Sequence, residues 1–378
     1  MKKLISILLT IVTLLSALAV MPSAGAETSS SEKTTYIPKK LAYSNKYGTV
    51  YVDGEDLVAE SAKGEKVTLE KSNPSVENPI LYFYMRGKKV IYHEIFSDEL
   101  YSIDIDGKNR KKLGTGINEL LGGYGDDVIV WIDEDGIYKI NSNGKKTKLL
   151  DTYKRYELFG GKLIGDSSVY DLKTSTVKTN TVKMNGFVIG QNHMYYKNGK
   201  NDLIQVDKNG AKKAVARNVK LICAVNNGAT VVYYKPHKVG NKKYRTFYRK
   251  TKGLKTVKLC RAKDIKNKVK SILAKSKKYD NCGVTKCDIE EVVIGRENAY
   301  FLVDFSFSQS YDGGEIILPV NLNTGKIGDT VKVMNDKTDC SIDHMRYENG
   351  YIYYEAYIDN ETDDSYSWKC DVRRKKAS

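Results

Sequence analysis

The chain has 378 residues, and 62 lysine and arginine residues against 46 acidic residues give it a formal net charge of +16. Tyrosine occurs 28 times and tryptophan only twice. This composition favours β-sheet, where a tyrosine ring packs on one face and its hydroxyl reaches water. After residue 26 no apolar run approaches the roughly 20 residues of a membrane-spanning helix, so we expect none in the rest of the chain.

The first 26 residues have the pattern of a secretory signal peptide. Lys2 and Lys3 precede an apolar stretch from Leu4 to Val20, and Ala24-Gly25-Ala26 fits the small-residue cleavage site. The alternative is an uncleaved membrane anchor. No cysteine follows the apolar stretch, so a lipid anchor of the bacterial lipoprotein kind is not expected. We therefore predict export, a polar disordered leader over residues 27–34, and one domain over residues 35–378.

The basic charge allows two interpretations. Cleavage would remove Lys2 and Lys3 and lower the net charge from +16 to +14. Most of the remaining basic residues are lysines, which we take to be spread along the chain, as on a solvated β-sheet surface whose edges are guarded by charge. The other interpretation is a selected anionic partner, such as an acidic cell-wall polymer or polysaccharide. Nucleic acid is not an expected partner of an exported protein.

A corner motif recurs along the chain at a spacing of about 40 residues, which is typical of propellers and solenoids. Six copies end in glycine and one ends in threonine. In three of them Asp-Gly or Asn-Gly stands at the corner, which predicts a two-residue hairpin with positive φ at both positions. The copies are Val58–Gly64, Tyr101–Gly107, Tyr138–Gly144, Tyr170–Thr176, Ile204–Gly210, Phe247–Gly253 and Pro319–Gly325.

Each unit also carries a short aromatic and β-branched strand before the corner and a lysine-rich strand after it. Val90-Ile91-Tyr92 and Lys108–Leu113 are examples. This order predicts a four-stranded antiparallel meander repeated around an axis, which is a single all-β propeller. Seven corners and an incomplete last unit predict seven or eight blades. We expect residues 35–40 to supply the closing strand of the last unit and so join the two ends of the ring.

The aromatic strand, the Leu-Tyr-x-Ile-x-x-Asp-Gly run at Leu100–Gly107 and Lys111-Lys112-Leu113 resemble a family of exported bacterial β-propellers of unknown function. This family is loosely similar to TolB-type propellers and to the propeller of the low-density-lipoprotein receptor. The resemblance is best over residues 87–215. It implies a binding or scaffolding role and carries no catalytic residues over to this chain.

Four insertions interrupt the later units, over residues 235–243, 261–286, 304–314 and 355–367. In a propeller the connections between second and third strands open on the same face as those between blades. Insertions on one face often mark the binding face of a repeat protein, although loops also lengthen neutrally. Their aromatic residues either stack on a partner or pin their own loops. The candidate binding-face residues are His237, Phe305, Phe307, Tyr311, Tyr357 and Tyr366.

The longest insertion predicts a helix near residues 264–278, because Ile265, Val269, Ile272 and Leu273 form one apolar stripe. We expect it to dock on the propeller; a basic amphipathic helix can also lie on an anionic membrane or bind a partner. Six cysteines in an exported chain suggest disulfides. Cys282 with Cys287 and Cys340 with Cys370 are the suggested pairs. The six are Cys223, Cys260, Cys282, Cys287, Cys340 and Cys370.

No motif for metal, cofactor or nucleophilic chemistry is found. The cysteine and histidine spacing of a zinc site, His-Glu-x-x-His and Gly-x-Ser-x-Gly are absent. We therefore expect a monomeric, non-catalytic binding or scaffolding propeller without cofactor or metal. Its partner would be an anionic envelope polymer or an envelope protein. The alternative is a carbohydrate-active hydrolase or lyase with acidic residues in the central channel, since two facing carboxylates suffice for glycoside hydrolysis.

Overall fold

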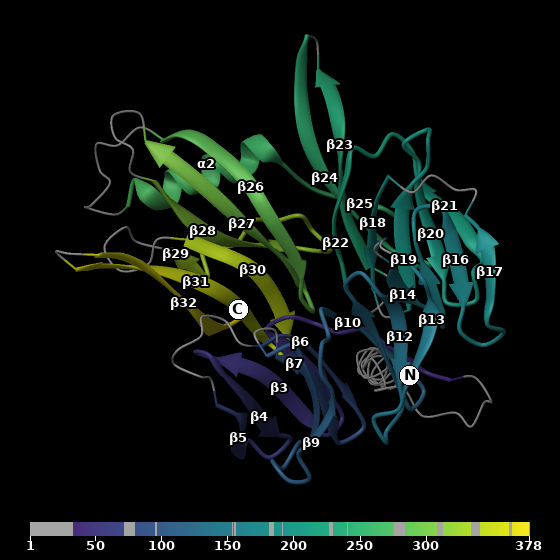
Figure 1. The fold of residues 1–378 in the computed structure, drawn as a ribbon. Coiled ribbons are helices and arrows are strands. Elements are labelled where there is room, and N and C mark those ends of the chain that lie inside the picture. Colours follow the sequence, from purple (N-terminus) through teal and green to yellow (C-terminus); the bar gives the residue numbers. More distant parts are fainter. Residues whose placement is uncertain are drawn as a thin grey trace, which may run out of the picture. The chain divides into compact units, whose positions relative to one another are not determined.

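The computed structural model describes residues 33–71, 80–94, 97–152, 154, 156–180, 185–190, 192–226, 230–239, 241–275, 284–307, 313–333, 341–362 and 365–377. In these ranges the strands form eight antiparallel sheets (Figure 1). The prediction of an all-β propeller is confirmed, with eight blades. None of the described residues forms a helix long and apolar enough to span a membrane.

The strands of each sheet follow one another in sequence. The first sheet consists of β2 (Ala42–Asn45), β3 (Gly48–Asp53), β4 (Asp56–Ser61) and β5 (Lys66–Glu70). The second consists of β6 (Ile80–Arg86), β7 (Lys89–Glu94), β8 (Glu99–Asp104) and β9 (Lys111–Gly114). The third consists of β10 (Glu119–Tyr124), β11 (Asp127–Ile132), β12 (Gly136–Ile140) and β13 (Lys146–Leu150), with β1 (Thr35–Tyr36) added beside β10.

The same order continues around the ring. The fourth sheet consists of β14 (Glu157–Phe159), β15 (Lys162–Ile164), β16 (Ser168–Asp171) and β17 (Thr176–Thr179). The fifth consists of β18 (Asn185–Ile189), β19 (His193–Lys197), β20 (Leu203–Asp207) and β21 (Lys212–Ala216). The sixth consists of β22 (Leu221–Val225), β23 (Thr230–Val239), β24 (Lys242–Thr251) and β25 (Val257–Arg261).

The last two sheets are less regular. The seventh consists of β26 (Val284–Ile294), β27 (Asn298–Phe307), β28 (Gly313–Asn321) and β29 (Lys332–Val333). The eighth has three strands in the described chain, β30 (Ser341–Glu348), β31 (Tyr351–Thr362) and β32 (Ser365–Lys376). The helix α2 (Ala262–Leu273) connects the sixth sheet to the seventh. It begins two residues before the predicted helix.

The repeats explain the sheets. Every predicted corner is the turn between the third and fourth strands of a sheet, and the aromatic motifs, such as Val90-Ile91-Tyr92, lie in buried second strands. Second strands are buried because neighbouring sheets cover both of their faces, so they read as continuous apolar runs. First strands contact one another around the ring, as β2 does β6 and β30 does β2, and are therefore innermost.

The corner turns differ from the predicted type. Gly107, Gly144 and Gly210 have positive φ, but the Asp or Asn before each of them does not. The N–H of Gly107 donates to the carbonyl oxygen of Asp104 at 2.8 Å, and the N–H of Asp104 donates to that of Lys108 at 2.9 Å. This geometry is a turn followed by one left-handed glycine, as in longer hairpin loops, rather than a two-residue hairpin. Glycine is therefore favoured at the corner, and in the fourth sheet Ser175 takes the positive φ instead.

The segment over residues 33–41, which we call the strap, does not close the last sheet. The expected closing strand is wrong, because β1 pairs with β10, with Tyr36 opposite Gly123, and Lys39 forms a β-bridge with Phe83 of β6. Tyr36 also stacks on Tyr84 at 5.6 Å between ring centroids. Both β10 and β6 are innermost strands, so the strap lies inside the ring.

The first residues of the strap already contact the propeller. Lys33 and Thr34 belong to the predicted disordered leader. The Lys33 ammonium lies 3.9 Å from a carboxylate oxygen of Asp127, and the carbonyl oxygen of Thr34 accepts the N–H of Gly125 at 2.8 Å. The side-chain hydroxyl oxygen of Thr35 accepts the N–H of Gly161 at 2.8 Å. The strap is thus tied to the third and fourth sheets before it reaches the eighth.

A buried ion pair ties the other end of the strap to the eighth sheet. Lys39 Nζ donates to Glu348 Oε2 at 3.2 Å and lies 4.4 Å from the ring centroid of Tyr43. Arg346 Nη2 donates to the same Glu348 oxygen at 3.2 Å. Lys40 Nζ lies 3.7 Å from Glu355 Oε1 of β31. The carboxylate of Glu348 thus holds two cations together where the chain's first and last sheets meet.

The pKa of Lys39 predicts a pH dependence of stability. Burial, with the nearby Arg346, lowers this pKa from 10.5 to about 7 despite Glu348. Between these values the unfolded chain binds a proton that the folded chain lacks, so stability rises with pH. We expect wild-type unfolding free energy to rise by about 1 kcal/mol per pH unit from pH 7 to 8.5, relative to Lys39→Met. Urea unfolding of both proteins measures this difference, and parallel pH profiles would contradict it.

The first and eighth sheets meet without a shared strand. Gly54, in the turn after β3, exchanges two backbone hydrogen bonds of 3.1 Å with Val372 of β32. Arg374 Nη1 donates to Glu60 Oε2 at 3.0 Å, and Tyr51 packs against Tyr353 at 5.6 Å between centroids. The strap, this two-bond bridge and these side-chain contacts therefore replace the expected closing strand.

Candidate functional site

Three long hairpins distinguish the last three sheets. The β23–β24, β27–β28 and β31–β32 hairpins have strands of 9 to 12 residues, against 3 to 6 for the same strands of the first five sheets. Each connects a second strand to a third, and α2 lies in a connection between sheets. Both kinds of connection open at one end of the propeller, because strand direction alternates. In Figure 1 the β23–β24 hairpin extends well beyond its neighbours.

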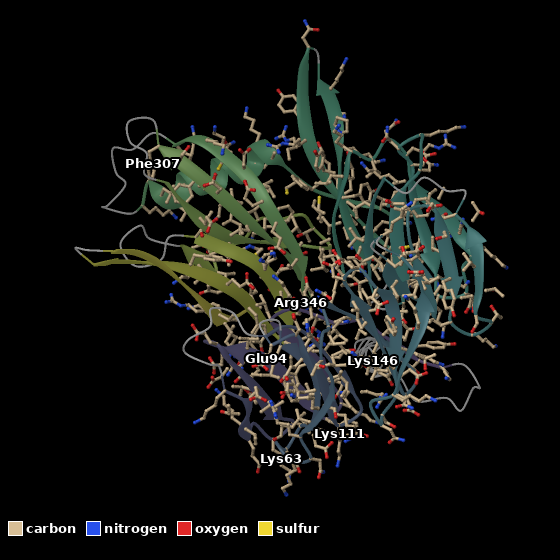
Figure 2. The ribbon with its side chains drawn as sticks, viewed as in Figure 1. Lys63, Glu94, Lys111, Lys146, Phe307 and Arg346 are labelled. Carbon is tan, nitrogen blue, oxygen red and sulfur yellow. The ribbon has the colours of Figure 1, made fainter. Side chains whose placement is uncertain are left out.

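Two of the predicted binding residues lie in the core. Phe305 and Phe307 are buried, and their rings pack edge to face at 5.6 Å between centroids. Residues 304–307 of the predicted insertion extend β27, so alternate residues point into a core that Ile265 and Val269 of α2 cover. Phe307 lies at the far end of this strand (Figure 2). These two rings therefore pin the extension and offer no exposed surface.

Three of the other predicted residues lie on the same long hairpins. His237 is exposed on β23, opposite Tyr244 of β24, and Tyr357 is half-buried on β31. Tyr366 lies on β32, and its side chain is outside the described part of the structure, as is Tyr311 entirely. The binding role of these four remains a prediction. The helix docks on the sheets through Ile265, Val269 and Leu273, as predicted.

The cysteines do not form the suggested clip after the helix. Cys223, Cys260 and Cys287 are free thiols, so the predicted pairing of Cys282 with Cys287 is wrong. Burial raises the pKa of both Cys223 and Cys260 to about 12, which keeps them protonated and unreactive at neutral pH. Cys282, Cys340 and the side chain of Cys370 lie outside the described residues. The pairing of Cys340 with Cys370 remains a prediction.

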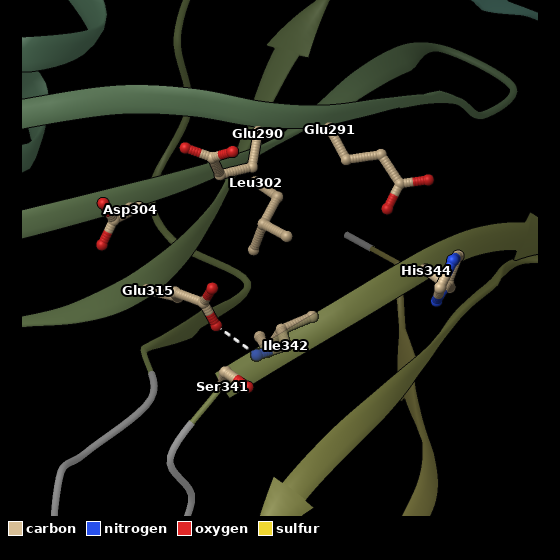
Figure 3. A pocket seen from close by; sticks show the side chains of 8 residues that line it. All are labelled: Glu290, Glu291, Leu302, Asp304, Glu315, Ser341, Ile342 and His344. Atoms are coloured by element: carbon tan, nitrogen blue, oxygen red, sulfur yellow. Dashed lines mark hydrogen bonds between the residues drawn. The ribbon is translucent and has the colours of Figure 1, made fainter. Parts of the chain in front are cut away.

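An acidic pocket of about 440 Å³ lies between the seventh and eighth sheets (Figure 3). A β-bulge between residues 289 and 291 of β26 brings Glu290 and Glu291 to this pocket together. Its lining residues come from β26, β27, β28 and β30. They are Glu290, Glu291, Leu302, Asp304, Glu315, Ser341, Ile342 and His344.

Most of the pocket's charged groups already have partners. Glu315 accepts the N–H of Ile342 (Figure 3), and Glu291 Oε2 accepts that of Met345 at 2.6 Å, so both carboxylates join the two sheets. Asp304 accepts from Lys286 at 3.4 Å. Nδ1 of His344 lies 2.7 Å from Oε2 of the buried Glu355. Across the described ranges no three Asp, Glu, His or Cys residues are arranged to hold a metal.

The charge distribution contains a signal that the initial sequence interpretation missed. The basic residues are not spread evenly. Residues 208–263 contain 17 of the 62 lysines and arginines and none of the 46 acidic residues. The other 322 residues contain 45 basic and 46 acidic residues and are nearly neutral. The whole net charge of the chain therefore resides on β21, the sixth sheet and the start of α2.

Comparisons with known proteins find the propeller architecture at low identity. No family model matches the chain, and no curated protein matches it. Among solved structures, BamB from Moraxella catarrhalis is 13% identical, with 86% of this chain and 94% of that chain covered and a TM-score of 0.43.

Two archaeal proteins are similar at the same level. The β-propeller domain of the Trilobed protease from Pyrococcus furiosus is 10% identical, with 93% of this chain and 95% of that chain covered and a TM-score of 0.39. The acylaminoacyl peptidase from Pyrococcus horikoshii is also 10% identical, with a TM-score of 0.41; 91% of this chain and 52% of that chain are covered.

Proposed function

We propose that this protein is an exported, non-catalytic propeller that binds a partner at the cell envelope or outside the cell. Binding takes place at the end that carries the three long hairpins and α2. The partner is an anionic envelope polymer or an envelope protein. Export rests on the signal-peptide pattern of residues 1–26.

The length of the hairpins is the observation that carries this proposal. Beyond Tyr233 and Phe247, which are buried, the β23–β24 hairpin continues for several residue pairs and exposes Pro236, His237 and Lys238. A two-stranded ribbon in water is at best marginally stable by itself, so this extension adds little to the stability of the fold. Extensions of this kind at one end of a repeat protein suit the capture of a partner.

Two observations favour binding over the alternative of a carbohydrate-active enzyme. The strap occupies the inside of the ring, where the alternative places its acidic residues. The carboxylates of the pocket between the seventh and eighth sheets instead hold those sheets together, through Glu291 and Glu315. Glycoside hydrolysis requires one carboxyl group free to donate a proton and a second facing it across the substrate.

Co-sedimentation with isolated bacterial envelopes tests the proposal. The full-length protein is mixed with untreated or protease-treated envelopes across a salt series. The comparison is a variant in which Asn-Gly replaces residues 236–245, which shortens the β23–β24 hairpin at the Lys235–Thr246 pair. We expect the wild type to sediment and the shortened protein to lose most of its binding.

The treatments separate the two partner classes. Loss of binding after protease treatment of the envelopes identifies a protein partner. Binding that survives protease treatment but falls with rising salt identifies an anionic polymer. If the wild type stays in solution with every envelope preparation, or if the shortened protein binds equally well, the proposal is wrong. Circular dichroism of the shortened protein confirms that its propeller is intact.

A further inference from the structure

We infer that the outer surface of β21, the sixth sheet and the start of α2 binds a linear polyanion, an acidic polysaccharide. We call this surface the basic rim. The inference rests on the proposed function for the class of partner, and it extends the binding surface beyond the hairpin end. The turn between β24 and β25, which carries Lys252 and Lys255, lies at the opposite end of these outer strands. The inference is carried by the acid-free segment over residues 208–263 and by the contacts of that segment's lysines.

Most cations of the basic rim are exposed and unpaired. Twelve of the 17 are exposed. Arg245 and Arg261 pair with Asp288 and Asp264, and the other ten form no ion pair with any acidic residue of the described ranges. These ten lie on β21, β23, β25 and α2 and in the connections between these elements. Sheets five and six are neighbours, since β18 contacts β22. The ten are Lys208, Lys212, Lys213, Arg217, Lys220, Lys238, Lys252, Lys255, Lys258 and Lys263.

The outer strands of other sheets show what an ordinary lysine does at these positions. Lys112 of β9 stands opposite Tyr101 and pairs with Glu99. Lys148 of β13 stands opposite Tyr138 and lies 2.8 Å from a carboxylate oxygen of Asp135.

In the sixth sheet Lys258 of β25 stands opposite Tyr248 in the same way. The residues of β24 that directly precede Tyr248 are Arg245, Thr246 and Phe247, so this strand offers Lys258 no acidic partner. Protection of a sheet edge does not require that acidic neighbours be absent. The lysines of the second and third sheets protect their edges while paired with acids.

The long hairpin contributes basic residues to the same segment. The register of β23 and β24 places Lys238 opposite Lys243, and neither strand contains an acidic residue.

The choice of cation indicates the kind of anion. Thirteen of the 17 basic residues are lysines. Lysine is a compact point charge, whereas the forked guanidinium of arginine suits bidentate recognition of individual phosphates. A series of separated lysines therefore suits a polymer with one charge per repeating unit. Among the described side chains of residues 208–263, Leu221 and Leu254 are the exposed large hydrophobics, which is little for insertion into a membrane.

Binding of the full-length protein to polygalacturonate, a polymer with one carboxylate per sugar, tests the inference. Its methyl-esterified form is the neutral control. The rim variant carries Lys252→Gln, Lys255→Gln and Lys258→Gln. The matched control carries Lys66→Gln, Lys112→Gln and Lys148→Gln, which removes the same charge from paired lysines of the first three sheets. A second rim variant changes Lys208, Lys212 and Lys213 to Gln.

At 50 mM salt we expect the rim variant to bind polygalacturonate about tenfold more weakly than the wild type, and the control variant to stay within about twofold. The second rim variant should behave as the first. Esterified polymer should not bind. Equal weakening of rim and control variants would overturn the inference, as would equal binding of the esterified polymer. It also fails if a DNA duplex or phosphatidylglycerol vesicles bind more tightly than polygalacturonate.

These results are distinguishable from failure of the proposed function. If the rim variants bind isolated envelopes as the wild type does, the basic rim is not the site and the proposed function stands. If the wild type binds envelopes but not polygalacturonate, the polysaccharide assignment alone is wrong. If it binds neither, both proposals are wrong.

Discussion

At pH 6, where Lys39 is protonated, replacing Glu348 by glutamine is expected to lower the free energy of unfolding by about 3–5 kcal/mol. The change leaves the buried Lys39 ammonium and the half-buried Arg346 guanidinium without their counter-charge. Lys39 and Glu348 are both nearly buried, and Arg346 shares the same carboxylate oxygen. Arg346 lies near the middle of the ring of sheets (Figure 2). The loss should be concentrated at the junction of the strap with β30.

Urea denaturation measures this loss, and hydrogen exchange of the amides over residues 33–41 locates it. Glu348→Gln combined with Lys39→Met should recover much of the stability, because the double variant removes one buried cation together with its partner. Asp53→Asn is the surface control. Asp53 and Lys66 are both about half exposed, so loss of their ion pair should lower the free energy of unfolding by less than about 1 kcal/mol. An equal cost at both sites would show that the buried pair is not what holds the strap.

Gly122→Ala should displace the strap from β10 and lower the unfolding free energy by about 2–4 kcal/mol. Gly122 has a φ of +140°, next to a β-bulge of β10. A Cβ at this position would overlap the carbonyl oxygen of Tyr36 and lie 2.9 Å from a methyl carbon of Leu158. Backbone cannot retreat as a flexible side chain does, so the pairing of β1 with β10 must yield.

Gly116→Ala separates the cost of a positive φ from the cost of steric overlap with a neighbouring backbone. Gly116 also has positive φ, at +66°, but a Cβ there would meet nothing within 4 Å. Its substitution should cost only the left-handed backbone penalty, about 1–2 kcal/mol, and leave the strap in place. Chemical denaturation compares the two variants, and hydrogen exchange at residues 35 and 36 reports on the strap. If both variants lose the same stability and protect the strap equally, close approach at Gly122 is not important.

The sequence by itself determined the repeating part of this protein. A period of about 40 residues, short aromatic strands such as Val90-Ile91-Tyr92, and a glycine at six of the seven corners predicted an all-β propeller of seven or eight blades. These signals are local, since alternation, turn chemistry and propensity act within one hairpin. The helix was predicted for the same reason, from the spacing of Ile265, Val269 and Leu273.

Only the tertiary structure decided where the irregular segments go. Strand propensity within residues 35–40 could not say whether they pair with the last sheet or with β10, because a β-edge accepts either partner. The decision depends on Gly122, which admits the backbone of Tyr36, and on Glu348, which accepts Lys39 from a position 309 residues away. The sequence allows Phe305 and Phe307 to be either exposed or buried. They are buried because α2 packs over them.

The candidate site divides in the same way. The acid-free segment over residues 208–263 can be read directly from the sequence, as a composition. That its lysines lack partners depends on cross-strand register, which places Lys258 opposite Tyr248 with no acid nearby. The pocket depends on a bulge in β26 and on the packing of two sheets. Local patterns thus determine the blades, whereas long-range contacts between distant residues decide what the blades bring together.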